Sequence, residues 1–234
     1  IFYKDFGFDN IVVKFSDRPE KRVGDDTIWD KAEKALIEAV ESTNQQYELN
    51  PGEGAFYGPK LEYVLRDAIG RDWQCGTLQV DFNLPGRLGS FYIGSDGEKH
   101  VPVMLHRAIF GSLERFTGIL IEHYAGKLPL WISPVQVSIL TISSHSNEYA
   151  QMIHDYCLTN NIRVELDIRN EKISYKIREH ISVKIPILFI IGQKEVDDKT
   201  VTIREIGDNE QKTLALEEAV KQIKQRIIPP DLID

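Results

Sequence analysis

The chain has 234 residues, of which 42% are hydrophobic and 27% are charged, and its formal net charge at pH 7 is −8. This balance is ordinary for a globular protein, and the length suits one large domain or two medium ones. No apolar run approaches the roughly 18 residues that a membrane helix needs, so we expect no membrane partner. The net negative charge argues against a protein that binds nucleic acid over its whole surface, but it leaves room for a local basic surface.

The chain opens with IFYKDFGFDN, without an initiator methionine or a signal peptide, and this predicts a fragment of a longer protein. The two cysteines, Cys75 and Cys157, form no CxxC pair, and their usage fits a reducing compartment. We therefore expect a cytoplasmic protein, and we expect part of its active site to lie outside this sequence.

The first half of the sequence predicts an antiparallel sheet with helices. IVVKF (11–15) indicates a strand, and apolar residues recur at helical spacing from about Asp26. Three further segments alternate as strands do: LEYVLRD after Lys60, CGTLQVDFNL (75–84) and SFYIG (90–94). A turn with Pro85, Gly86 and Gly89 would join the last two. HVPVMLHRAIF then leads into a helix that Ser112 is placed to cap and Gly126 to end.

The second half changes rhythm after KLPLWISP (127–134), which reads as a linker with an exposed Trp131. Strands are indicated by VQVSILTI, IRVELDI, PILFIIG and VTIREI, and they alternate with helices of ordinary length. This alternation predicts an α/β domain with a mixed, mainly parallel sheet flanked by helices. The predicted domains are residues 1–129 and 130–234.

The stretch GEGAFYGPK (52–60) looks like a phosphate-binding loop but fits neither standard glycine template. A P-loop needs Ser or Thr directly after its lysine, whereas Lys60 precedes Leu61. A dinucleotide fingerprint needs a preceding strand and a following helix, and Pro59 stands where that helix would begin. The stretch is therefore interpreted as a turn that enters a strand and carries Tyr57 and Lys60.

The strand WQCGTLQVDF offers the first candidate ligand surface. Strict alternation places Thr77, Gln79 and Asp81 on one face, together with Trp73 and Cys75, and leaves Gln74, Gly76, Leu78 and Val80 on the other. Thr77 and Gln79 offer both donors and acceptors, but a half-solvated strand is the simpler interpretation. His106 stands in an apolar run, and no histidine spacing in the chain completes a zinc site.

One arginine and one cluster of basic residues suggest anion binding. Arg115 lies in the first turn of its helix, where a cation is unfavourable because it opposes the helix dipole. Unless an acidic side chain pairs with it, we expect Arg115 to bind an anion such as a phosphate. The cluster, in the second half, could be a nucleic-acid footprint or simply a solvated face. It comprises Arg163, Arg169, Lys172, Lys176, Arg178 and Lys184.

Six segments, taken in order, closely resemble the threonyl-tRNA synthetase family: RPEKRVG, GEGAFYGPKLEY, WQCGTLQVDF, VPVMLHRAIFGSLERF, RNEKISYKIREH and IIGQKEV. The resemblance implies a partial α+β antiparallel class II catalytic core over 1–129, with motif 3 but without motif 1 and most of motif 2. An α/β anticodon-binding domain would follow over 130–234. It further implies ATP-dependent activation of L-threonine, transfer to tRNA(Thr), a homodimeric intact enzyme, and an isolated fragment that is inactive.

The same resemblance implies roles for individual residues. Arg115 would be catalytic, and ATP with its Mg²⁺ would meet Gln74, Thr77, Ser112 and Arg115. Tyr57 and Gln79 would line the threonine pocket, and His106 would be one of three zinc ligands, the other two lying upstream. The anticodon bases would be read by Asn170, Glu195 and Arg204, and the stretch from Lys172 to Arg178 would follow the tRNA backbone.

Two other interpretations remain open from the sequence. Another class II enzyme, such as the prolyl synthetase, shares the anticodon domain but has no reason to keep a metal-ready histidine. A non-catalytic RNA-binding paralogue would keep the fold, but it would be expected to lose some of the residues suited to catalysis.

Overall fold

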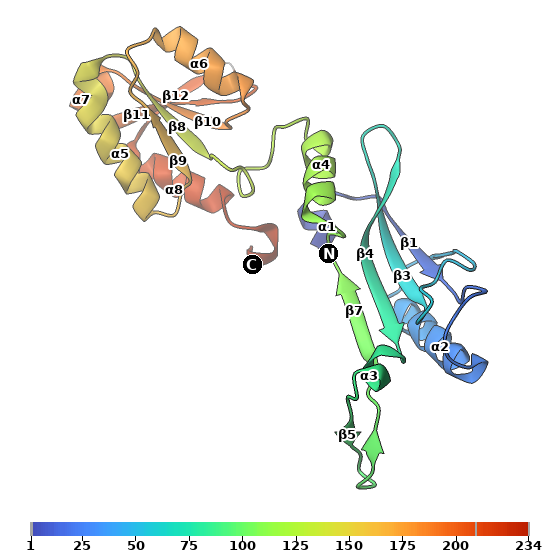
Figure 1. The fold of residues 1–234 in the computed structure, drawn as a ribbon. Helices are drawn as coiled ribbons and strands as arrows, with labels where there is room; N and C mark the ends of the chain where they lie inside the picture. Colours follow the sequence, from blue (N-terminus) through green and yellow to red (C-terminus); the bar gives the residue numbers. More distant parts are fainter. Residues whose placement is uncertain (1, 209, 234) are drawn as a thin grey trace. The chain divides into compact units, whose positions relative to one another are not determined.

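The computed structural model describes residues 2–208 and 210–233. They divide into two compact units between His123 and Tyr124. Each unit has its own sheet (Figure 1). None of the described helices combines the length and the apolar character that a bilayer span requires.

The first unit is built on a sheet with the strand order β2-β1-β3-β4-β7. Its strands are β1 (Ile11–Ser16), β2 (Glu48–Leu49), β3 (Lys60–Arg66), β4 (Asp72–Asp81) and β7 (Met104–Ala108). The β1–β3, β3–β4 and β4–β7 pairs are antiparallel, while the short β2 lies parallel to β1. The predicted antiparallel sheet is therefore confirmed.

Two helices of this unit follow the apolar periodicity of the sequence. The helix α2 (Asp26–Ser42) starts at Asp25, whose carboxylate accepts the Ile28 amide at 3.0 Å. It buries Trp29 and packs against the sheet through Ala32, Leu36 and Val40. The helix α4 (Leu113–His123) buries Phe116, Ile119 and Leu120. A short helix, α1 (Phe2–Asp5), places buried Tyr3 beside Phe116, with ring centroids 6.5 Å apart.

The expected pairing of SFYIG with the strand before it is wrong. That segment contributes only β5 (Tyr92–Ile93), which pairs with β6 (Lys99–His100) in a separate hairpin beyond the end of the main sheet (Figure 1). The joining turn contains the short helix α3 (Leu84–Arg87), with Pro85 in its first turn. On the side away from β3, the antiparallel partner of β4 is instead β7, in the segment that the sequence placed only as a lead into the next helix.

The second unit is an α/β layer structure with the strand order β12-β11-β10-β8-β9. Its strands are β8 (Val137–Thr141), β9 (Val164–Asp167), β10 (Ile187–Ile191), β11 (Thr200–Glu205) and β12 (Gln211–Ala215). Among the described residues, β8 is parallel to β9 and β10, whereas the β10–β11 and β11–β12 pairs are antiparallel. The mixed sheet is confirmed, with parallel pairs making up half of it rather than most of it.

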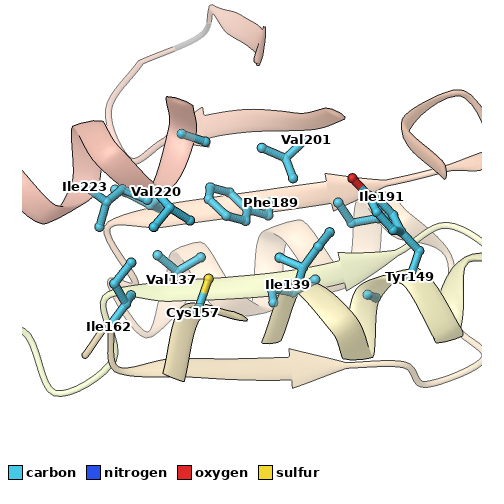
Figure 2. Close-up of a cluster of buried hydrophobic side chains, with 14 of the residues drawn as sticks. Val137, Ile139, Tyr149, Cys157, Ile162, Phe189, Ile191, Val201, Val220 and Ile223 are labelled. Carbon is cyan, nitrogen blue, oxygen red and sulfur yellow. The ribbon is translucent and has the colours of Figure 1, made fainter. Parts of the chain in front are cut away.

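Helices cover both faces of this sheet. Its helices are α5 (Asn147–Thr159), α6 (Ile173–Ser182), α7 (Gln193–Asp198) and α8 (Leu216–Arg226), with the 3-10 turns η1 (Ser144–Ser146) and η2 (Pro230–Leu232). Figure 2 shows the core in which α5 and α8 meet the sheet through Val137, Ile139 and Phe189. The alternate residues Leu140 and Leu188 pack against α6 on the other face, which explains why β8 and β10 are buried at every position.

The segment expected to be an open linker is folded onto the second unit. Leu130 is buried in that core, and the buried Gln136 amide donates to Leu130 O at 2.9 Å. Arg163 donates to Ser133 O and Trp131 O at 2.9 and 2.8 Å. One member of the expected basic cluster therefore holds this segment in place.

Candidate functional site

A row of polar side chains crosses the first sheet on the face opposite α2. Ser16 pairs with Lys60, Lys60 with Gln79, and Gln79 with His106. Residues that pair directly in an antiparallel sheet point to the same face, so four strands contribute to this row. The apolar residues between them, such as Leu61 and Val80, face the core under α2.

The loop GEGAFYGPK lies against this row and brings Tyr57 to it. The close approach requires glycine, because a Cβ at Gly58 would lie only 1.6 Å from Val80 O. The Tyr57 hydroxyl donates to Gln79 Oε1. Burial and the nearby Asp81 carboxylate raise the pKa of Tyr57, so its phenol remains a donor at neutral pH. The expected turn into a strand is confirmed, since β3 begins at Lys60.

His106 is oriented by a buried carboxylate. Its Nε2 lies 2.8 Å from Asp81 Oδ2, and the Tyr57 and His106 ring centroids are 5.4 Å apart. Asp81 Oδ1 also accepts the amides of Asn83 and Leu84, at 2.8 and 3.0 Å. Burial opposes ionisation of Asp81, but these hydrogen bonds and His106 outweigh it and hold its pKa below the usual range. The sequence pattern placed Asp81 on this face but did not identify it as the partner of His106.

A β-bulge corrects the predicted faces of the strand WQCGTLQVDF. Tyr63 pairs with Gly76 and Val64 pairs with Gln74, so Cys75 is the extra residue. Since Val64 shares a face with Lys60 on β3, the bulge moves Gln74 to the same face as Thr77 and Gln79. Strict alternation had placed Gln74 on the opposite face. Burial raises the pKa of the Cys75 thiol, which is consistent with an inert structural cysteine.

Lys60 lies in a second cluster on the same face. Its Nζ is 2.6 Å from Glu62 Oε1, and the buried Ser16 hydroxyl donates to the same oxygen at 3.2 Å. Asn50 in turn donates to Ser16 Oγ at 3.2 Å. The Lys60 charge is therefore fixed by a buried carboxylate, beside the Gln79 and Tyr57 pair.

Arg115 extends from the start of α4 toward the bulge. The Ser112 hydroxyl accepts the Arg115 amide at 3.0 Å, as expected for a capping residue. The guanidinium donates to Gln74 O at 2.7 Å and lies 5.8 Å from the Trp73 ring centroid. No salt bridge joins Arg115 to a carboxylate within 2–208 and 210–233, so its charge is available to an anion.

The Trp73 ring that Arg115 contacts is held in place by the turn between β3 and β4. Asp67 accepts the Trp73 indole N–H at 2.8 Å and the Arg71 amide at 2.8 Å. Burial disfavours the charge on Asp67, but the hydrogen bonds from Trp73 and Arg71 outweigh it, so the pKa of Asp67 lies well below its usual range. Trp73 and Arg115 line an open cleft of about 410 Å³ along the side of α4.

We expect Asp81→Asn to destabilise the first unit measurably. The change removes a charge-assisted hydrogen bond from a site where the carboxylate is only 2% exposed, and such losses cost about 1–3 kcal/mol. The free energy of unfolding, followed by circular dichroism in urea, measures the effect. Asp96→Asn is the matched control, because the Asp96–His100 pair at 2.8 Å is exposed. Equal effects of the two changes would contradict the assigned importance of burial.

In the second unit, the candidate residues lie on different segments around one sheet. Asn170 is exposed in the loop that follows β9. Glu195 lies in the first turn of α7, after β10, and accepts the Gly192 amide at 2.9 Å and the Thr202 hydroxyl at 2.8 Å. Arg204 is on β11, where its Nε is buried and finds no hydrogen-bond partner among the residues that the structure describes. Asn170 and Glu195 follow the carboxyl ends of parallel strands, the edge at which open α/β sheets bind ligands.

The expected basic cluster is only partly available to a ligand. Arg169 is paired with Asp167 and Glu179, at 2.7 and 2.6 Å. Lys176 is fully buried, so the expectation that it lies along a nucleic-acid backbone is wrong. Helical spacing explains this position, because Ile173, Lys176 and Ile177 share the face of α6 that packs on the sheet.

Two family models match the chain. Residues 1–124 match the tRNA synthetase class II core domain (G, H, P, S and T). Residues 136–226 match the anticodon binding domain.

Curated relatives give a consistent picture. The chain is 61% identical over 221 residues to the threonine–tRNA ligase of Ehrlichia canis (strain Jake), with 94% of this chain and 35% of the relative covered. It is 58% identical over 226 residues to the threonine–tRNA ligase of Wolbachia sp. subsp. Brugia malayi (strain TRS), with 97% and 36% covered. The chain thus spans about a third of the length of the curated relatives that it matches.

One solved structure resembles the whole chain. It is the crystal structure of the RNA binding domain of threonyl-tRNA synthetase from Cryptosporidium parvum Iowa II, with a TM-score of 0.92 and 37% sequence identity. The match covers 100% of this chain and 58% of that one.

Proposed function

This chain belongs to the class II aminoacyl-tRNA synthetases, and from this premise we propose that it forms part of a threonine–tRNA ligase. The enzyme would activate L-threonine with ATP to give threonyl-adenylate and pyrophosphate, and then transfer the threonyl group to the 3′ end of tRNA(Thr). The observation that carries the proposal is the convergence of Tyr57, Gln79 and His106 on one polar face, in a chain so similar to known threonine–tRNA ligases.

The amino-acid pocket would be the space bordered by Tyr57, Gln79 and His106. Valine has the shape of threonine but lacks its hydroxyl, and an apolar pocket separates such pairs poorly. A pocket whose polar groups require the hydroxyl rejects valine much more strongly, because those groups would otherwise stay unpaired. The Tyr57 hydroxyl and the Gln79 amide, already joined by a hydrogen bond, supply such groups.

His106 is suited to be one ligand of a zinc ion. Its hydrogen bond with Asp81 uses Nε2, and this leaves Nδ1 for a metal, in the arrangement by which a carboxylate commonly orients a metal-binding histidine. No group of three or more potential ligands gathers among the described residues, so this chain would contribute His106 alone. When bound, zinc would supply a Lewis-acid centre for the amino group and the hydroxyl of threonine.

ATP would lie over Gln74, Thr77 and Arg115, with Mg²⁺ sharing the charge of its phosphates. The bulge puts Gln74 and Thr77 on one face, and Arg115 reaches the same end of β4 from α4. Ser112 would act by fixing the start of that helix. The catalytic contribution of Arg115 would be electrostatic, since its charge stabilises the phosphate as pyrophosphate departs.

The second unit would read the anticodon of tRNA(Thr). Asn170 can donate and accept at a base edge, Glu195 can accept from one, and Arg204 can donate. The unpaired Nε of Arg204 supports this role, because a buried donor without a partner is costly unless a ligand or water completes it. The boundary between the catalytic and anticodon-binding domains would fall near residue 129 of the sequence, and the intact enzyme would be a cytoplasmic homodimer.

Amino-acid-dependent exchange of pyrophosphate into ATP tests the proposal in a complete enzyme that carries this sequence and is confirmed to hold zinc. We expect exchange with threonine, weaker exchange with serine, and none with proline. Exchange that depends on proline would identify another class II synthetase instead. Absence of threonine-dependent exchange would reject the proposal, and tRNA binding without any exchange would favour the RNA-binding paralogue.

A further inference from the structure

Lys176 of α6 is one of the largest fully buried side chains among the described residues. Its Nζ donates to Thr141 O and Asp167 O at 3.0 Å each and lies 3.4 Å from Thr141 Oγ1. Three acceptors thus surround a side-chain ammonium, which has three N–H groups. A buried lysine is costly unless it is fully satisfied, so this position has a specific structural purpose.

The two carbonyls belong to neighbouring parallel strands at the point where their pairing ends. The last pair between β8 and β9 joins Leu140 to Asp167, and β8 ends at Thr141. Beyond this point the described residues of the two strands form no further ladder pair, and the Thr141 hydroxyl makes only a long bond to Asp167 O, at 3.5 Å. The Lys176 amine therefore bridges their last carbonyls, and it does so at the carboxyl edge of the sheet, where Asn170 follows β9.

The loop between β9 and α6 depends on the same connection. Asp167, at its start, accepts the Arg169 amide at 3.1 Å, and its carboxylate also bonds the Arg169 guanidinium and His180 Nε2. Arg169 reaches Glu179 of α6 at 2.6 Å. Asn170 comes next in the chain, directly after a residue that is held by both Asp167 and α6.

The charge of Lys176 faces Asp167, and further charged groups from β9, the following loop and α6 surround this pair. Burial lowers the pKa of Lys176, while Asp167 opposes that effect from 3.7 Å. Around Asp167 stand Arg169 and His180, and His180 in turn faces Glu165 at 2.8 Å. Burial disfavours the charge of Asp167, but the bonds from Arg169 and His180 hold its pKa well below the usual range.

We propose that Lys176 is a positioning residue for tRNA recognition, which clamps the ends of β8 and β9 and thereby fixes the loop that presents Asn170. This inference rests on the proposed function. It assigns a new role to one lysine of the basic stretch: Lys176 acts within the protein, and the exposed Lys172 and Arg178 are left for contact with phosphates.

Lys176→Met in the complete ligase tests the proposal, because methionine keeps the apolar stem and removes the donors. The Thr141 carbonyl would lose its lysine donor, and the Asp167 carbonyl would keep only the long bond from the Thr141 hydroxyl at 3.5 Å. We therefore expect the KM for tRNA(Thr) to rise about tenfold or more. The kcat of charging and threonine-dependent pyrophosphate exchange should stay near wild type. Lys176→Gln, which keeps amide donors on a shorter stem, should have a smaller effect and serves if the methionine variant does not fold.

Cys157→Ala is the matched control, since Cys157 is fully buried in the core on the other face of the same sheet. It should lower thermal stability and leave the KM for tRNA unchanged. Equal changes of KM in the two variants, or an unchanged KM in folded Lys176→Met, would overturn the proposal. Asn170→Ala combined with Lys176→Met should be less than additive, because both changes act on one loop.

Hydrogen exchange gives a readout that does not depend on the proposed function. The amides of residues 168–171 should exchange faster in Lys176→Met than in Cys157→Ala. Faster exchange with a wild-type enzyme that fails to activate threonine would reject the proposed function and leave the clamp intact. Unchanged exchange in the loop would reject the clamp, whatever the enzyme activates.

Discussion

His106→Ala in the complete ligase is expected to abolish threonine activation and zinc binding together. Changes to residues that only orient a metal ligand already cost about 10–100-fold in affinity or activity, so loss of a direct ligand should cost more than about 100-fold. Zinc content by elemental analysis and threonine-dependent pyrophosphate exchange measure the two effects on the same sample. The nearby Tyr57 and Gln79 would keep their hydrogen bond, so the pocket itself should persist.

His100→Ala is the control for this prediction. His100 also pairs with an aspartate, Asp96 at 2.8 Å, but on an exposed hairpin away from the polar row. It should retain zinc and activity. Full zinc occupancy in His106→Ala would show that the metal is held elsewhere, whereas loss of exchange with zinc retained would assign His106 a role in threonine binding only.

Arg115→Ala should slow adenylate formation by about 100- to 1,000-fold, the usual cost of removing a group that stabilises transition-state charge. The effect should appear mainly in the kcat of pyrophosphate exchange, because the arginine gains its partner as charge develops on the phosphates. Arg115→Lys should recover little of this, since a lysine ammonium does not reproduce the planar guanidinium that lies over the Trp73 ring and at the same time donates to Gln74 O.

Arg66→Ala provides the comparison on the same sheet. Arg66 is exposed and paired with Asp72 at 2.8 Å, and surface pairs of this kind contribute little. It should leave the exchange rate unchanged. A similar rate for Arg115→Ala and Arg66→Ala would contradict a catalytic role for Arg115.

Helix and strand periodicity was sufficient to predict most elements of this protein. The apolar spacing of Trp29, Leu36 and Val40 predicts α2, and the structure buries these residues. The apolar run around Phe189 predicts a strand covered on both faces, as β10 is. The glycine stretch up to Lys60 also behaves as expected, because turn chemistry and close approach depend mainly on local residue types.

Pairing and register were decided by the tertiary structure. The sequence does not show that β4 pairs with β7 and not with the SFYIG segment. Nor does it show that Cys75 forms a bulge, which places Gln74 on the same face as Thr77. A shift of one residue reverses every side chain that follows, and this shift depends on contacts between segments far apart in the chain.

The same division applies to individual side chains. The residue types at Tyr57, Gln79, His106 and Arg115 and their resemblance to a known family were visible in the sequence. That Asp81 orients His106 and that Lys176 is buried between two strand ends became visible only in the fold. A periodic pattern encodes which face of an element a residue occupies, but the partner it meets there is set by the packing of distant segments.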